Sequence, residues 1–120
     1  MPTYLLQVAY TPESWSNMVK SPQDRIAAVT PAIERLGGKV IAGYFAFGEY
    51  DLVAIADFPN NVAAASFSLA VAAAGAVSKL HTTPLMSMKE GMDAMKRAQT
   101  STYHPASAVK AAAKKAAKRR

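Results

Sequence analysis

Four stretches of the chain have the length and the side-chain pattern of β-strands, whose successive residues point to opposite faces with a period of two. The four stretches are residues 3–10, 39–47, 50–58 and 79–88. A helical period appears between the first two, at Ile26, Val29, Ile33 and Leu36. A second helix is expected over residues 62–77, which are Ala-rich and apolar nearly all round, so it should be buried on more than one side. The pattern therefore predicts the element order β-α-β-β-α-β.

Residues that start or end helices and strands support these boundaries. Thr11-Pro12 favours a turn or short helix, and Ser21-Pro22-Gln23-Asp24 resembles a capping box, so the first long helix is expected to start there. Gly37-Gly38 favours the end of that helix, and Gly48-Glu49 favours a tight hairpin between the two middle strands. Pro84 lies inside the last strand, which is therefore expected at an edge of the sheet or at a bulge.

This order is that of a split β-α-β unit, which is an α+β, ferredoxin-like domain with a four-stranded antiparallel sheet and both helices on one face. Strict alternation in residues 39–47 puts Val40, Ala42 and Tyr44 on one face and the residues between them on the other. Residues 50–58 are also apolar on both faces, yet two helices cover only one face. A second copy of the chain is the simplest cover for the other face, so at least a homodimer is expected.

Basic residues are concentrated after Pro105. Six of the 14 Lys and Arg residues lie there without any acid, and the other eight balance the eight acids, so the net charge of +6 belongs to this tail. Such a tail binds polyanions such as nucleic acid non-specifically, or it is a solvated segment that aids solubility; both interpretations stay open. We expect a domain over residues 1–98, ending in a short helix, and a flexible or helical tail over residues 99–120. The candidate polyanion-binding residues are Lys110, Lys114, Lys115, Lys118, Arg119 and Arg120.

The composition excludes several kinds of site. The chain has no cysteine, so it forms neither a disulfide nor a thiolate metal site. Its two histidines, His81 and His104, are far apart and lack a local acidic partner, so no metal site is expected, and no cofactor motif is present. The N-terminus lacks the basic region of a signal peptide, and the longest apolar run is shorter than the roughly 20 residues that span a bilayer. We therefore expect a cytoplasmic protein without a membrane span.

Gly48-Glu49-Tyr50-Asp51 resembles the motif of the GYD family of small bacterial proteins. The preceding Gly37-Gly38-Lys39-Val40 and Gly43-Tyr44-Phe45, and the opening residues 1–4, are also similar to that family. The resemblance covers roughly residues 2–97 and omits the basic tail. It implies a ferredoxin-like fold of the dimeric α+β barrel type, and it brings no established reaction.

Four residues are candidates for a ligand-binding site: Tyr44, Tyr50, Asp51 and His81. A binding module needs only a cavity and a few polar groups, so the leading expectation is a small-ligand-binding or regulatory domain without catalysis of its own. In the enzyme alternative, a cofactor-independent oxygenase or isomerase uses His81 as base and Tyr50 and Asp51 to orient the substrate. Structural roles stay open as well, because an aspartate can accept backbone N–H groups at a turn. The third alternative is a nucleic-acid-associated protein that acts through its tail.

Overall fold

The computed structural model describes residues 1–107 and divides the chain into two compact units, Met1–Met86 and a second that begins at Ser87. The domain boundary expected at residue 98 stays a prediction. The first unit contains the strands and all the described helices except the last. In chain order its elements are β1 (Thr3–Tyr10), α1 (Pro12–Lys20), α2 (Arg25–Arg35), β2 (Lys39–Phe45), β3 (Leu52–Asp57), α3 (Asn61–Ala73) and β4 (Val77–Leu85).

The four strands form one antiparallel sheet in the order β2-β3-β1-β4. β1 pairs with both β3 and β4, and β2 pairs with β3, so the first strand of the chain lies inside the sheet. This arrangement is ferredoxin-like, and the predicted α+β fold class is confirmed. β4 is an edge strand, as its internal Pro84 led us to expect.

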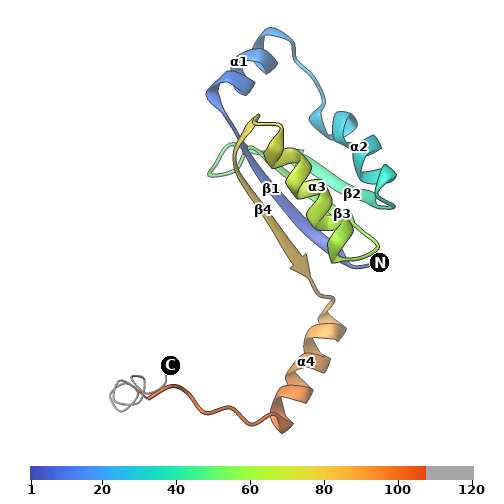
Figure 1. Cartoon of the computed structure of the whole chain (residues 1–120), viewed down its shortest axis with the longest axis vertical. Coiled ribbons are helices and arrows are strands. Elements are labelled where there is room, and N and C mark those ends of the chain that lie inside the picture. The colour runs from blue at the N-terminus through green and yellow to red at the C-terminus, as the bar shows by residue number, and fades with distance from the viewer. Residues whose placement is uncertain (108–120) are drawn as a thin grey trace. The chain divides into compact units, whose positions relative to one another are not determined.

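Helices α2 and α3 lie on the same face of the sheet (Figure 1). The strands turn alternate side chains toward them, because successive residues of a strand point to opposite faces. Ile33 of α2 and Phe58, just after β3, are fully buried in this layer. The core cluster of buried side chains comprises Tyr4, Leu6, Ile33, Ala54, Ala56, Phe58, Ala64 and Phe67. Only Ala64 and Phe67 of α3 are buried, so the expectation that this helix is covered on several sides is wrong.

Helix α2 starts three residues later than the capping-box pattern predicted. Asp24 is the N-cap, and its Oδ1 accepts hydrogen bonds from the backbone N–H groups of Ile26 and Ala27, both at 3.0 Å. Ser21 instead closes α1, because its N–H donates to the carbonyl of Asn17 at 2.9 Å. The end of α2 follows the prediction. Gly37 has φ of +83°, where an L side chain is strained, and Gly38 N–H reaches back to the Ile33 carbonyl at 2.9 Å.

The connection between β2 and β3 differs from the expected tight hairpin at Gly48-Glu49. β2 ends at Phe45 and β3 starts at Leu52, so a loop of residues 46–51 joins them. A bulge at Ile41 also shifts the register of β2: Val40 lies opposite Ala56, and Ala42 opposite Ile55. Strict alternation is therefore wrong for this strand, because the extra residue moves every following side chain to the other face.

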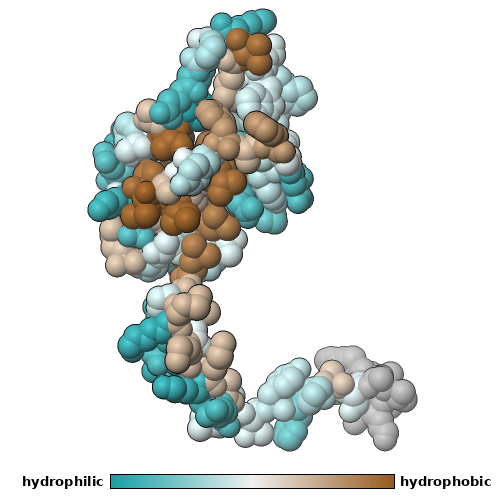
Figure 2. Space-filling model, turned by 180° about the vertical axis from the view of Figure 1, so that it is seen from behind, coloured by the Kyte–Doolittle hydropathy of each residue, from teal (hydrophilic) through white to brown (hydrophobic). Residues whose placement is uncertain are grey.

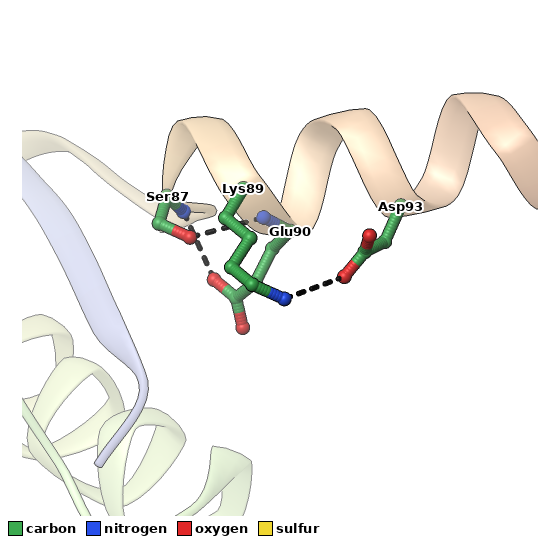
Figure 3. A network of polar contacts seen from close by, with 4 residues as sticks. All are labelled: Ser87, Lys89, Glu90 and Asp93. Atoms are coloured by element: carbon green, nitrogen blue, oxygen red, sulfur yellow. Dashed lines mark hydrogen bonds and ion pairs between the residues drawn. The ribbon is translucent and has the colours of Figure 1, made fainter.

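The second unit contains the amphipathic helix α4 (Met88–Thr100). Its first turn is held by a capping box, in which Ser87 Oγ accepts from Glu90 N–H and Glu90 Oε1 accepts from Ser87 N–H (Figure 3). Lys89 and Asp93 form an exposed ion pair one turn apart, at 3.5 Å. Met88, Met92 and Met95 are exposed along this helix. Within residues 1–107, no helix is long and apolar enough to cross a membrane.

Gly38→Ala should lower the free energy of unfolding by about 1–3 kcal/mol, which is the usual cost of overpacking. A Cβ at this position would lie 2.6 Å from the Asp57 carbonyl oxygen and 2.9 Å from Ile33 Cγ2, and the backbone oxygen has little room to move. Urea unfolding followed by circular dichroism measures the change. Gly48→Ala is the control, since its Cβ would meet nothing within 4 Å, and it should stay within about 0.5 kcal/mol of the parent. Equal stabilities of the two variants would contradict the close contact at Gly38.

Candidate functional site

A cavity of about 270 Å³ lies between the sheet and the helices α2 and α3. Its walls come from the helix-facing side of β1, β2 and β3, from α2 and α3, and from the start of β4. Almost every side chain in these walls is a hydrocarbon. The lining residues are Leu6, Val8, Tyr10, Arg25, Ile26, Ala28, Val29, Ala32, Ile33, Val40, Leu52, Ala54, Phe67, Ala70, Val71, Ala74, Ala76 and Val77.

The cavity results from an uneven distribution of side-chain volume between the two layers. At the Tyr4 end of β1, aromatic rings fill the space: Phe58 packs edge-on against Tyr4, with ring centroids 5.7 Å apart, and lies 6.1 Å from Phe67. Toward the other end of β1, the side chains that face the sheet are smaller: Ala70 and Val71 of α3, and Ala74, which caps that helix. The aromatic end keeps the layers apart while the alanine end leaves the gap unfilled, so a hollow persists there.

Two polar side chains lie in the wall of this cavity: Tyr10, at the end of β1, and Arg25, the first residue of α2. Both are half-buried. Burial raises the pKa of the Tyr10 hydroxyl above its usual value, and the neighbouring Arg25 side chain partly opposes that rise. Tyr10 is therefore protonated at neutral pH and can donate a hydrogen bond. Neither residue was among the predicted site residues, although alternation in β1 does place Tyr10 on the face of Leu6 and Val8.

Of the predicted site residues, Tyr50 and His81 lie together, outside the cavity. Their rings are tilted against each other with centroids 5.4 Å apart, and Lys79 Nζ lies 5.3 Å from the Tyr50 ring centroid. Lys79 also pairs with Glu49 at 3.4 Å, although both side chains are largely exposed, so this ion pair adds little to stability. His81 and Lys79 are exposed, on the sheet face that α2 and α3 leave open. A catalytic role for His81 stays a prediction.

Asp51 lies at the end of the β2–β3 loop, where its carboxylate joins three segments of the fold. Its Oδ2 accepts hydrogen bonds from the Tyr10 backbone N–H at 2.9 Å and from Trp15 Nε1 at 3.2 Å. Its own N–H donates to the Val8 carbonyl, and its carbonyl accepts from Ala46 N–H, both at 2.8 Å. This geometry is that of a structural aspartate at a turn, which was one of the two roles left open.

Tyr44 is 68% exposed and lies on the open sheet face, opposite Val53. Val53 in turn pairs with Gln7, and Gln7 with His81. Tyr44 and His81 are thus three strand spacings apart, a distance of about 14 Å across the sheet. The predicted residues therefore do not converge on one site. The basic residues of the predicted polyanion-binding tail lie outside the described residues. Among residues 1–107, no three His, Asp or Glu side chains are grouped so that they could hold a metal ion.

The fold and the cavity define a class: a small ferredoxin-like α+β domain with an apolar hollow between its sheet and its helices. The family model for the GYD domain matches residues 4–95, which is most of the chain. The chain therefore belongs to the GYD domain family, as the residues around Gly48-Glu49-Tyr50-Asp51 suggested. No curated protein and no solved structure matched this chain.

Asp51→Ala should lower the free energy of unfolding by about 1–3 kcal/mol, because the part-buried donors of Tyr10 and Trp15 lose their acceptor. Asp51→Asn keeps one oxygen acceptor and should lose less. Urea unfolding measures stability, and the fluorescence of Trp15, the single tryptophan of the chain, reports its changed surroundings. Asp93→Ala, at an exposed residue of α4, is the control and should change stability by less than about 0.5 kcal/mol. An Asp51→Ala variant as stable as that control would rule out the structural role.

Proposed function

We propose that this GYD domain is a ligand-binding or regulatory module, without catalysis of its own, that holds a small apolar molecule between its sheet and its helices. The observation that carries the proposal is the cavity of about 270 Å³, whose walls are almost entirely hydrocarbon. Small-molecule sites are concave, mostly apolar and supplied with a few polar groups, and this hollow has all three properties. Apolar cavities stay free of water and accept apolar guests, because water inside would lack hydrogen-bond partners.

The size of the hollow limits the ligand. An apolar cavity of about 150 Å³ accommodates benzene, so one of about 270 Å³ has room for roughly ten non-hydrogen atoms. The shape of the wall also favours an internal ligand over a protein partner, since the hollow lies under α2 and α3. Its affinity for a simple apolar compound of that size should be modest, with a dissociation constant on the order of 0.1–1 mM.

We further propose that the domain works as a homodimer joined through the open sheet face. Ile55, Leu5 and Val53 lie on this face at half-buried positions, and Tyr44 is exposed beside them. Seen from behind, hydrophobic side chains gather over the part of the sheet that α2 and α3 leave uncovered (Figure 2). Covering such an apolar face is favourable, and a second copy related by a twofold axis is a simple partner for it.

Filling the hollow should abolish ligand binding. Titration calorimetry with octan-1-ol is expected to show binding to the full-length parent and little or none to Ala32→Leu, whose larger side chain enters the cavity from α2. This variant should be as stable as the parent or more so, since cavity filling commonly adds about 0.5–2 kcal/mol. Ala27→Leu places the same side chain at an exposed position of α2 outside the cavity wall, and it should bind like the parent. Equal affinities of the parent and Ala32→Leu would contradict the proposed site.

Ile55→Glu should convert the dimer to a monomer, because each interface would then bury an unpaired charge. A buried unpaired charge costs about 3–5 kcal/mol, which corresponds to a dissociation constant raised more than about a hundredfold. Analytical ultracentrifugation measures the mass, and circular dichroism checks that the variant folds. Val62→Glu is the matched control: it puts the same charge on an exposed apolar residue of α3 and should leave the dimer intact. A monomeric parent chain, or a dimer disrupted by Val62→Glu alone, would refute this arrangement.

A further inference from the structure

The cavity has one polar end. Arg25 is the charged residue of its wall, and Tyr10 is the other residue there with a polar side chain; the remaining lining residues are hydrocarbon. The two lie close enough for Arg25 to influence the hydroxyl of Tyr10. A ligand that fills the hollow therefore has carbon on most sides and meets a cation and a hydroxyl at one end.

The charge of Arg25 has no carboxylate partner within residues 1–107. Its Nη1 donates to Gln23 Oε1 at 2.8 Å, a neutral side-chain amide, and the ion pairs of the described residues join Lys79 to Glu49 and Lys89 to Asp93. A guanidinium has five N–H donors, so most of them are not used by Gln23. The residue is nevertheless half-buried and lines the cavity.

The position of Arg25 in α2 also favours an anion. It is the first helical residue, at the positive end of the helix dipole, so its own charge adds to that of the helix instead of offsetting it. Asp24 and Asp51, the acids beside Arg25 and Tyr10, already accept hydrogen bonds from other groups. Asp24 accepts the N–H groups of Ile26 and Ala27, and the Oδ2 of Asp51 accepts from Tyr10 N–H and Trp15 Nε1.

We propose that the ligand of this cavity is a small apolar monocarboxylic acid, with its hydrocarbon part in the hollow and its carboxylate against Arg25 and the Tyr10 hydroxyl. The inference rests on the proposed function of the cavity and specifies its ligand class. A planar guanidinium matches a carboxylate with two parallel hydrogen bonds, and Tyr10 supplies a further donor. A single arginine suits one carboxylate better than a phosphate, whose higher charge calls for more donors than this wall supplies.

The test compares three probes with the same eight-carbon chain and different head groups: octanoate, octan-1-ol and octylamine. Octanoate has about the size that the cavity accommodates. Titration calorimetry on the full-length protein at pH 7 and moderate salt should rank octanoate tightest, octan-1-ol weaker and octylamine weakest. Ala32→Leu should lose octanoate binding as well, which places the carboxylate ligand in the same hollow.

The Arg25→Gln variant isolates the head-group contact. It should weaken octanoate binding about ten- to a hundredfold, the range expected for a charged hydrogen bond, and weaken the binding of the uncharged octan-1-ol much less. Arg35→Gln removes a charge from the other end of α2, outside the cavity wall, and should bind octanoate like the parent. Thermal unfolding by circular dichroism checks that both variants fold.

The possible outcomes distinguish the carboxylate assignment from the proposed ligand-binding function. Equal binding of octanoate and octan-1-ol, with both lost in Ala32→Leu, would overturn the carboxylate assignment and leave the binding function standing. Octanoate binding weakened equally by Arg25→Gln and Arg35→Gln would also overturn it, since the effect would then be one of net charge. Failure of octanoate and octan-1-ol alike to bind would overturn both the inference and the proposed function.

Discussion

The contact of Phe58 with Tyr4 and Phe67 sets the spacing between the two layers of this domain. Large rings at one end of the sheet hold α3 away from the strands, and the helix is too rigid to collapse onto the sheet farther along. From Phe67 onward, α3 lines the cavity with Ala70 and Val71, whose small side chains do not fill the remaining space. The hollow is thus a consequence of the well-packed aromatic end. Removing one of these rings would change the dimensions of the hollow, as a substitution in the cavity wall would.

The polar end of the hollow is held by backbone hydrogen bonds to two carboxylates. Asp24 fixes the first turn of α2, from which Arg25 projects, and Asp51 fixes the backbone of Tyr10 at the end of β1. Since these acceptors bind main-chain N–H groups, they position the two polar side chains without contacting them. Asp51 belongs to the Gly48-Glu49-Tyr50-Asp51 segment that resembles the GYD motif, so part of that segment positions the end of β1 beside the cavity.

Much of the fold could be predicted from the sequence, because burial alternates locally along β1 and β3 and α2 has a helical period of apolar residues. The capping residue of α2 could not be predicted, because Ser21 and Asp24 are both good N-caps and the choice between them depends on where α1 ends. The bulge at Ile41 leaves no periodic signal. The cavity depends on how side-chain volume is distributed between the sheet and the helix layer. Its polar end combines Tyr10 of β1 with Arg25 of α2. An arginine in a first helical turn usually extends into solvent, so nothing in the sequence singled out Arg25.

Pro84 has an effect beyond its place in β4. An edge strand offers a row of unpaired backbone donors to which another extended chain can add, and long exposed edges are a common start for ordered aggregates. Pro84 contributes no N–H to this strand, and Lys79 places a charge near its other end. Growth of the sheet by addition of a strand at β4 is therefore disfavoured, which helps to keep an Ala-rich, apolar domain of this size from polymerising.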